Sequence, residues 1–598
     1  MAKEDAVGNT GRSNHCFVLG ILVVHGLLLA WSARLHTPVA SEMAHLAAGI
    51  SHLQLNRFDL LAVNPPLVRS VAAIPVVMLS PETDWRKYDP HPLSRSEHAV
   101  GRDFVSVNGT RAFQLLTLGR WACIPFCLAG GLACYGWGRS LYGRRSGLLA
   151  LVLWCFSPYV LGHGSLMICD AHAAAMAVVA SYAFRRWLAE PSWAAASVAG
   201  ILLGIAELCK STLLLLYPVW LLAWLASHFC HGGQARRAVG IELGMLLALV
   251  LTSVLVINVG YGFDGSLQRL DTYTFYSVIL SGVQPAENAV AQGWNRFAGS
   301  WLGPLPVPLP ACYLKGLDKQ KSDFDGRQWS FLAGRWTQGG WWHYYLYALA
   351  IKVPVGTWIL LLMAIAMSLW APAWNGPLRD EVLLVGTASA VLVLVSSQTG
   401  FNHHSRYVLP ALPFVFVWVS KTARAITGKR RWLACVVLTS SVWSVASSLW
   451  VYPHSFSYFN ELIGGPARGH EYLAESNVAW GQDLFYLQRW LDRHPEARPI
   501  HVRELAYFDL NVLGIKAKEV PVGPGGSRAA NLVARQLGPK PGWYALNVSR
   551  LHESSGSYAY FTRFEPVARI GYSICVYHIT PDEANRVRRE LGLPELPG

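Results

Sequence analysis

Apolar runs of close to 20 residues recur through most of this sequence, and each is long enough to cross a bilayer as a helix. We count about eleven such runs. They cover residues 17–34, 114–137, 146–168, 170–189, 193–210, 212–230, 239–261, 344–370, 381–399, 406–424 and 432–451. Hydrophobic residues make up 53% of the chain and charged residues only 14%. The sequence therefore predicts a mainly α-helical, polytopic membrane protein rather than a soluble domain.

The basic residues predict how the chain is oriented in the membrane. Short loops after the second, fourth, sixth and tenth runs hold Arg139, Arg144, Arg145, Arg185, Arg186, Arg236, Arg237, Lys421, Arg424, Lys429, Arg430 and Arg431. All four loops fall on one side, which the positive-inside rule makes cytoplasmic. We thus expect an inner-membrane protein with a cytoplasmic N-terminus. This topology accounts for the net charge of +14, and no nucleic acid partner is expected.

The predicted organisation is a transmembrane module over residues 1–451 and an extracytoplasmic α/β domain over residues 452–598. The module carries two large outer loops, residues 35–113 and 262–343. Strand-like runs in the second domain are Ile500–Arg503, Trp543–Val548 and Val567–Ile579. A disulfide between Cys312 and Cys575 is left open, since both would lie outside. No phosphate-binding loop or dinucleotide motif occurs, which disfavours nucleotide chemistry.

The first outer loop places an acidic residue where the membrane meets water. Glu42, His45, Gly49 and His52 recur at helical spacing and predict one face of a short helix. A carboxylate there could take a proton from an incoming hydroxyl group. The alternatives are a solvated or capping glutamate, and a metal site formed by Glu42, His45 and His52.

Further charged residues lie at the predicted outer ends of the spans. Asp170 stands in a tight turn, where function and helix capping are equal alternatives. Lys210, Lys352 and Arg406 lie at one membrane depth and together would suit a lipid phosphate, although each alone could simply reach to the headgroups. Glu207 could pair with Lys210 on the same helix face.

The order of these motifs resembles the lipid-carrier-dependent glycosyltransferases of the GT-C superfamily, in particular the protein O-mannosyltransferase and aminoarabinose-transferase branch. The likeness covers most of the chain. Its motifs are Ser41-Glu42, Asn64-Pro65-Pro66-Leu67, the Asp170 turn, Ala206-Glu207-Leu208-Cys209-Lys210, Lys352-Val353-Pro354, Ser405-Arg406-Tyr407-Val408-Leu409-Pro410, Tyr458-Phe459-Asn460-Glu461 and Glu475-Ser476-Asn477-Val478-Ala479-Trp480-Gly481-Gln482-Asp483-Leu484.

The resemblance implies a GT-C-like membrane fold and transfer of a sugar from a polyprenyl-phosphate donor to a protein, lipid or glycan acceptor. It implies that Glu42 is the catalytic base, in a position where the family commonly shows Asp-Glu and this chain shows Ser41-Glu42. The family lysine of the first outer loop is replaced by Asn64, so donor phosphate binding passes to other cations. The expected phosphate-binding residues are Lys210, Arg406, Arg69 and Lys352.

The predicted chemistry asks for only one carboxylate base. A polyprenyl phosphate leaves as a stabilised anion, so the site must mainly supply positive charge, and the attack would invert the anomeric centre. Asp170 would orient the acceptor or the sugar. The expected substrate contacts come from His45, Asn64, His172, His403 and His404. We expect no required metal, with a divalent ion left possible.

Two other functions remain open on the sequence alone. A secondary transporter would place ionisable residues at mid-membrane on broken helices, whereas here they lie in loops and at the ends of spans. A non-catalytic protein that only binds the lipid carrier is the other alternative.

Overall fold

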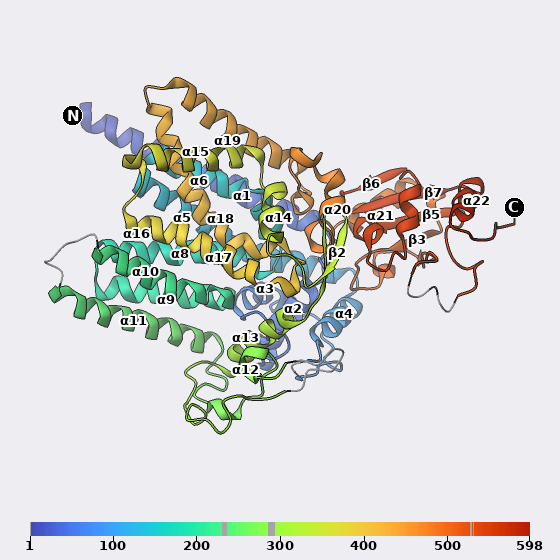
Figure 1. The fold of residues 1–598 in the computed structure, drawn as a ribbon, viewed down its shortest axis with the longest axis horizontal. Coiled ribbons are helices and arrows are strands. Elements are labelled where there is room, and N and C mark those ends of the chain that lie inside the picture. The colour runs from blue at the N-terminus through green and yellow to red at the C-terminus, as the bar shows by residue number, and fades with distance from the viewer. Residues whose placement is uncertain are drawn as a thin grey trace.

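The computed structural model describes residues 2–91, 93–229, 236–284, 293–526, 529 and 532–597, with only the backbone for residues 2–14, 229 and 236–238. Most of the described chain is helical (Figure 1). The helices of the first half are α1 (Ala2–Leu35), α2 (Glu42–Leu55), α3 (Leu67–Val77), α4 (Glu97–Asn108), α5 (Arg111–Tyr142), α6 (Arg144–Cys155), α7 (Pro158–Gly164), α8 (Cys169–Ala189), α9 (Trp193–Cys209), α10 (Leu216–Phe229) and α11 (Arg236–Gly260).

The second half continues with helices and adds seven strands among the described residues. The helices are α12 (Val278–Ser281), α13 (Ala311–Asp325), α14 (Tyr344–Lys352), α15 (Val355–Trp370), α16 (Leu378–Glu381), α17 (Thr387–Ser397), α18 (Leu412–Val419), α19 (Arg431–Val451), α20 (Gly469–Tyr472), α21 (Leu484–Arg493) and α22 (Pro581–Glu590). The strands are β1 (Trp329–Leu332), β2 (Arg335–Gln338), β3 (Ile500–Arg503), β4 (Ala517–Lys518), β5 (Gly542–Asn547), β6 (Ala568–Ile570) and β7 (Ile574–Ile579).

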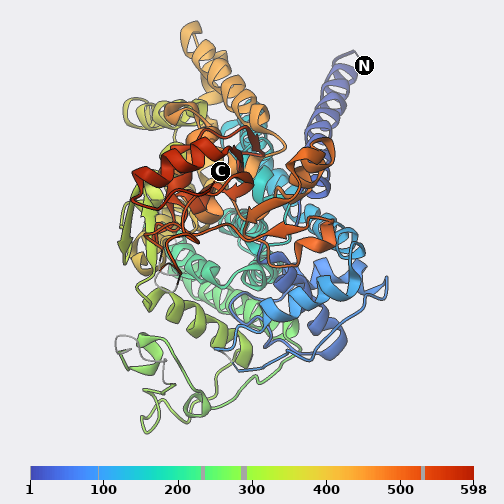
Figure 2. The ribbon, with the colours of Figure 1, turned by 90° about the vertical axis from the view of Figure 1, so that its right-hand side faces the viewer.

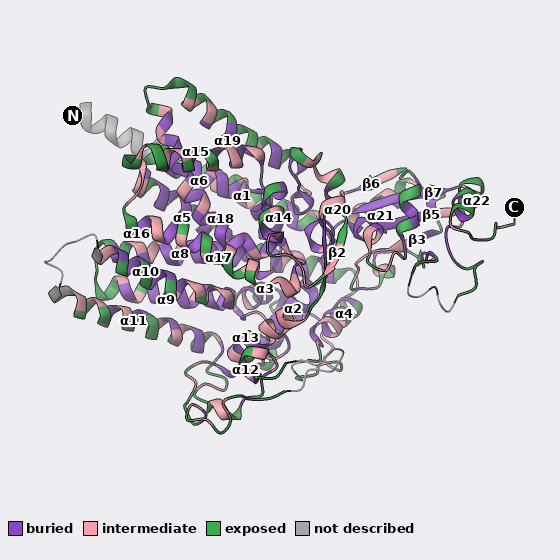
Figure 3. Cartoon of the chain, in the orientation of Figure 1, coloured by how far each residue is buried: buried purple, intermediate pink, exposed green. Residues whose placement is uncertain are grey.

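Six helical segments of the described chain are long and apolar enough to cross a membrane, and two bent helix pairs raise this number to eight. The six are His15–Leu35, Arg111–Tyr142, Ser211–His228, Val239–Gly260, Ser405–Thr427 and Arg431–Val451. The bent pairs are α6 with α7, at 52°, and α14 with α15, at 114°. The chain is thus a multi-pass membrane protein. Figure 3 shows exposed residues along α11 and α19, on the outside of the bundle.

The expected count of eleven spans is not confirmed, and the difference lies in three segments. The predicted run 170–189 forms α8, a helix of sufficient length that carries Asp170, Arg185 and Arg186. The run 193–210 forms α9, which has only 17 residues. The run 381–399 is divided between α16, a π-helical turn at Val382–Gly386 and α17. Charge, short length and a local break in the helix each lower a segment's capacity to span alone.

Small residues let neighbouring helices of the bundle approach closely. Gly200 and Gly204 lie four residues apart on α9 and face α11. A Cβ atom on Gly200 would stand 2.5 Å from the carbonyl oxygen of Leu249, and one on Gly204 would stand 2.6 Å from Val256. Any larger side chain would push the two helices apart, as in other membrane helix pairs that pack through small residues.

The C-terminal region contains a five-stranded mixed sheet with the order β4-β3-β5-β7-β6. Strands β3, β4 and β5 are parallel, whereas β7 is antiparallel to both β5 and β6. The predicted strands at Ile500 and Trp543 are confirmed. The run predicted as one strand, Val567–Ile579, forms the hairpin β6–β7, because Gly571 and Tyr572 adopt positive φ angles of 58° and 64°. Cys312 and Cys575 are both free and buried, so the disulfide left open is absent.

The sheet and the helices α2, α3 and α4 of the predicted first outer loop lie at the same end of the bundle, away from the N-terminus (Figures 1 and 2). Hydrogen bonds between two segments far apart in sequence connect the two regions. Thr37 N–H donates to the carbonyl of Gln482 at 2.9 Å, and Ala40 N–H donates to that of Trp480 at 3.1 Å. The Thr37 hydroxyl also donates to the Gly481 carbonyl at 2.6 Å. Segments far apart in sequence thus form one wall at this end.

Candidate active site

A cavity of about 140 Å³ opens at the end of the bundle where α2, α8, α9 and the Arg406 segment converge. Its lining is rich in charged and aromatic side chains. The residues are Ser41, Ala44, His45, Leu61, Val63, Asn64, Arg95, Glu97, His98, Ile168, Cys169, Asp170, Lys210, Gln320, Asp323, Phe324, Phe401, Arg406, Tyr407 and Trp480. These come from both predicted outer loops, the transmembrane module and the start of the C-terminal region, so the cavity is assembled from segments between Ser41 and Trp480.

Asp170 lies at the centre of the cavity wall and holds two cations. Its Oδ1 accepts a hydrogen bond from Lys210 Nζ at 2.5 Å, and its Oδ2 lies 3.0 Å from Arg406 Nε. All three side chains are nearly buried. Asp170 is in the first turn of α8, where a carboxylate also interacts favourably with the helix dipole. With two cations and one carboxylate, the cluster keeps one positive charge that can attract an anion.

Aromatic rings fix the two cations of this cluster. The Arg406 guanidinium lies 4.3 Å from the Trp480 ring centroid and 5.6 Å from that of Tyr407. Lys210 Nζ lies 4.8 Å from the Tyr407 ring. Ser476 adds a fixed acceptor, since Arg406 Nη1 donates to its hydroxyl at 2.9 Å. Cation–π contacts are worth more where water is excluded, so the rings hold both cations in place before a ligand arrives.

Two predicted substrate-binding residues do line the cavity. His45 on α2 is nearly buried, and burial first and the Arg69 charge second lower its pKa to about 3. It is therefore neutral at pH 7 and offers a hydrogen-bond donor and an acceptor to a polar ligand. The Asn64 side-chain oxygen accepts a weak hydrogen bond from Cys169 Sγ at 3.4 Å. Ser41 also lines the cavity, at the position where the resemblance implies an aspartate.

Two acidic residues that were not predicted from the sequence also line the cavity, Glu97 at the start of α4 and Asp323 of α13. The nearest cation to Glu97 is Arg95 at 3.6 Å, and the neighbouring His98 lies 4.0 Å away, so Glu97 is not held in a close ion pair like that of Asp170. Arg95 is instead bonded to Asp323 of α13. The signal in the sequence was the cluster Arg95-Ser96-Glu97-His98, in which an arginine and a histidine flank a carboxylate within the predicted first outer loop.

A larger cavity of about 450 Å³ adjoins the first and shares four of its lining residues: Leu61, Val63, Arg95 and Glu97. Its remaining wall mixes polar and apolar residues and includes the charged residues Arg57, Asp59, Lys315 and Lys319. Arg57 pairs with Asp59 at 2.7 Å. The shared residues make Glu97 and Arg95 the partition between the two spaces, which together can hold a ligand larger than either.

Glu42 does not line either cavity. It is fully buried, and its carboxylate forms a two-point ion pair with Arg120 of α5, at 2.9 Å to Nε and 2.5 Å to Nη2. It also accepts backbone hydrogen bonds from Val39 N–H and Met167 N–H, both at 3.0 Å. Four donors therefore occupy the carboxylate. This geometry fits a group that holds α2, α5 and the Asp170 turn together, and it gives no support to Glu42 as the base.

The other predicted site residues lie outside the lining of the small cavity. The Lys352 ammonium donates to the carbonyl of Asn477 at 2.5 Å and lies 4.3 Å from the Phe459 ring. Arg69 Nε donates to His52 Nε2 at 2.7 Å, and its two terminal nitrogens are buried with no partner in the described chain. His172 Nδ1 bonds the Ile168 carbonyl at 2.8 Å.

His403 and His404 flank the cavity without lining it. His403 lies 3.6 Å from Glu475, and His404 Nδ1 lies 2.5 Å from the Ser476 hydroxyl that also binds Arg406. His404 and Arg406 therefore share Ser476 as a hydrogen-bond partner. The set Glu42, His45 and His52 does not converge as metal ligands, because the Glu42 carboxylate is filled by donors and His52 bonds Arg57 and Arg69.

Residues 114–257 match the family model described as dolichyl-phosphate-mannose-protein mannosyltransferase. This segment runs from α5 to α11 and includes Asp170 and Lys210. No protein of curated function matches the chain.

Three solved structures are similar over nearly the whole chain. ArnT from Cupriavidus metallidurans in the apo state has 14% identity and a TM-score of 0.42, covering 94% of this chain and 98% of that one. ArnT from the same organism bound to undecaprenyl phosphate has 13% identity and a TM-score of 0.40, covering 94% and 97%. The oligosaccharyltransferase of Archaeoglobus fulgidus in the apo form has 12% identity and a TM-score of 0.35, covering 92% and 72%.

Proposed function

We propose that this chain, whose residues 114–257 match the mannosyltransferase family, transfers a sugar from a polyprenyl-phosphate donor to an acceptor hydroxyl or amine at the extracytoplasmic face. The observation that carries the proposal is the buried cluster of Asp170, Lys210 and Arg406 in the wall of the cavity. The family description names a sugar linked to a polyprenyl phosphate, and the cluster offers the two cations that such a phosphate needs.

The donor phosphate would compete with Asp170 for Lys210 and Arg406. A phosphate oxygen that approaches both cations takes over the contacts that now hold the carboxylate at 2.5 and 3.0 Å. The loss of its cationic partners makes a carboxylate a stronger base. Donor binding would thus prepare Asp170 to act, and the site would become reactive only when the lipid carrier is in place.

In the transfer step, Asp170 accepts the proton of the acceptor while the acceptor oxygen or nitrogen attacks the anomeric carbon. The bond between that carbon and the phosphate oxygen breaks, and the electron pair leaves with the polyprenyl phosphate. Lys210 and Arg406 stabilise the charge that develops on the leaving phosphate. Attack opposite to the leaving group inverts the anomeric centre. Glu97, on the partition between the cavities, would orient the acceptor.

The orientation predicted from the basic loops would put both cavities and the C-terminal sheet outside the cytoplasm. Sugars on lipid carriers are available there without nucleotides, which agrees with the absence of nucleotide-binding motifs. The alternative acceptors are protein, lipid and glycan, and the larger cavity is the space that would receive them. No metal is proposed for the transfer step.

Binding of undecaprenyl phosphate to the purified full-length protein tests the proposal without knowledge of the sugar or the acceptor. Lys210→Met removes one cation and should weaken binding by about 10-fold or more, since charge-assisted contacts are worth about 1.5–3 kcal/mol. Asp170→Asn removes the competing carboxylate and should strengthen binding several-fold. Lys518→Met, at an exposed position on β4, is the matched control and should bind like the wild type.

Turnover is measured with undecaprenyl-phosphate mannose and undecaprenyl-phosphate aminoarabinose, with membranes from cells lacking the protein as the acceptor source. Asp170→Asn should lower kcat by about 10²- to 10⁴-fold, as expected for loss of a general base. Tighter phosphate binding together with lost turnover would be a combination that a merely structural aspartate would not produce. Wild-type turnover in Asp170→Asn, or unchanged binding in Lys210→Met, would refute the proposal.

A further inference from the structure

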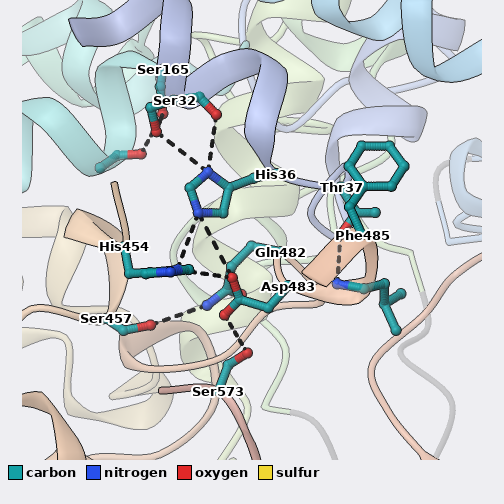
Figure 4. A network of polar contacts seen from close by, with 12 residues as sticks. Ser32, His36, Thr37, Ser165, His454, Ser457, Gln482, Asp483, Phe485 and Ser573 are labelled. Carbon is teal, nitrogen blue, oxygen red and sulfur yellow. Dashed lines mark hydrogen bonds and ion pairs between the residues drawn. The ribbon is translucent and has the colours of Figure 1, made fainter. Parts of the chain in front are cut away.

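Two histidines and an aspartate meet outside the cavity, at the joint between the membrane helices and the C-terminal region (Figure 4). His36 follows α1, His454 follows α19, and Asp483 precedes α21. His36 Nε2 lies 3.4 Å from His454 Nδ1 and 3.7 Å from Asp483 Oδ1. His454 Nδ1 lies 3.1 Å from the same Asp483 oxygen. The three atoms thus form a nearly equilateral triangle.

The size of this triangle matches a metal site. Zn²⁺ binds imidazole nitrogen and carboxylate oxygen at about 2.0–2.1 Å in a tetrahedron, whose neighbouring ligand atoms are then about 3.3–3.4 Å apart. The observed separations of 3.1, 3.4 and 3.7 Å surround that value. An ion close to the centre of the triangle would reach all three atoms with little movement of the side chains. The fourth position would remain for a water molecule.

Surrounding hydrogen bonds orient two of the three ligands, His36 and Asp483. His36 Nδ1 lies 3.0 Å from the Ser32 carbonyl, and because a carbonyl only accepts, Nδ1 carries the proton and Nε2 presents its lone pair to the triangle. The second oxygen of Asp483 accepts a hydrogen bond from the Ser573 hydroxyl at 2.6 Å, which leaves Oδ1 for the centre. Metal-binding histidines and carboxylates in proteins have outer partners of this kind.

The place is also shielded from water. Asp483 is fully buried, and His36 and His454 are largely covered. The Tyr486 ring lies against both imidazoles, with centroid distances of 5.6 Å to His36 and 4.8 Å to His454. Among the residues that the structure describes, this is the group of three such side chains with ligand atoms close enough to share an ion. A buried carboxylate gains most from a cation when water is excluded.

We propose that His36, His454 and Asp483 bind a structural divalent cation of the zinc class, which ties the ends of two transmembrane helices to the C-terminal region. The site is separate from the transfer chemistry and does not depend on the proposed function. The site is nevertheless close to the cavity along the chain, because Asp483 follows the cavity residue Trp480 by three positions. The ion would therefore fix the segment that carries Trp480, the ring on which Arg406 stacks.

The test is the metal content of the full-length protein, purified without a polyhistidine tag and supplied with zinc during expression. The wild type should hold about one zinc per chain, with only nitrogen and oxygen ligands at about 2.0–2.1 Å in its X-ray absorption spectrum. Asp483→Asn and His454→Gln should each lose most of the metal. His494→Gln is the matched control, since His494 is a half-buried histidine paired with Glu496 outside this group.

A wild-type protein that binds less than about one zinc per ten chains under these conditions would overturn the proposal, as would full zinc content in Asp483→Asn. If a variant does not fold, the wild type still decides the matter. Its zinc should be removed by a strong chelator, the loss should lower the temperature of unfolding, and added zinc should restore it. An absorption spectrum with sulfur ligands would place the metal elsewhere and refute the site.

Discussion

Replacement of Glu42 by glutamine tests whether the Glu42 carboxylate has a structural or a catalytic role. Each Glu42 oxygen accepts one backbone N–H and one Arg120 N–H, with Oε1 bonded to Met167 and Nε, and Oε2 bonded to Val39 and Nη2. In either orientation of a glutamine amide, its NH₂ group would face two donors. The variant would lose two hydrogen bonds and leave the Arg120 charge buried without its counter-ion.

The expected cost of Glu42→Gln is about 3–5 kcal/mol in the free energy of unfolding, the usual effect of removing one partner from a buried pair. Activity per folded molecule, measured well below the unfolding temperature, should stay within about 10-fold of the wild type, because Glu42 does not reach the cavity. The stability assay is unfolding of the detergent-purified protein, followed by tryptophan fluorescence and by loss of monodispersity.

Glu42→Asp is the matched control for charge. It keeps the anion but shortens the side chain by one methylene, so it should destabilise the protein less than glutamine does. A Glu42→Gln protein with wild-type stability and turnover lowered by about 10²-fold or more would refute this reasoning and restore Glu42 as the base.

Three further predictions concern residues with separate roles. Trp480→Ala removes the ring on which Arg406 stacks. A desolvated cation–π contact is worth about 1–2 kcal/mol, so the variant should bind undecaprenyl phosphate about 5- to 30-fold more weakly. Unchanged binding would contradict this prediction. Gly571 has a φ of 58°, and Gly571→Ala would place a Cβ atom 2.2 Å from the Asp483 carboxyl carbon, so the variant should lower the unfolding temperature. Gly556→Ala is the control, because Gly556 also has a positive φ but lies in open space, and it should lower the unfolding temperature less. Burial raises the pKa of Glu504 from 4.5 to about 7. Since the folded state then binds the proton more tightly, its contribution to stability is full below pH 4.5 and is lost as the pH rises through about 7; Glu504→Gln should flatten that part of the stability profile.

The sequence singled out Asp170, Lys210 and Arg406 one by one, because ionised groups at the ends of apolar helices must meet water, a partner or a cavity. It grouped the two cations with Lys352, whereas the structure brings them to Asp170. It also predicted the helix that begins at Glu42, from residues that recur at helical spacing. Strands β3 and β5 followed from short β-branched and aromatic runs bounded by turn residues. These are local patterns, and each is set by neighbours close in the chain.

What could not be predicted depends on partners that are distant in sequence. Helical spacing places Glu42 and His45 on one face of α2, but it does not say that Glu42 turns to Arg120 while His45 turns to the cavity. Arg120 stands alone in an apolar run. Because its partner Glu42 lies 78 positions away, nothing near Arg120 in the sequence indicated the ion pair. His36 and Asp483 are separated by most of the chain, so their meeting was equally invisible.

The pairing of Thr37–Ala40 with Trp480–Gln482 has a consequence for how the protein is made. The Thr37 hydroxyl bonds the Gly481 carbonyl across 444 positions of sequence, and Trp480 completes the cavity. Chains are synthesised at about 5–20 residues per second, so at least about 20 seconds pass between the synthesis of Thr37 and that of Gly481. The cavity is thus completed late in synthesis, after the membrane helices have been made. A chain cut short before residue 480 would contain Lys210, Asp170 and Arg406 and still lack the wall that holds them.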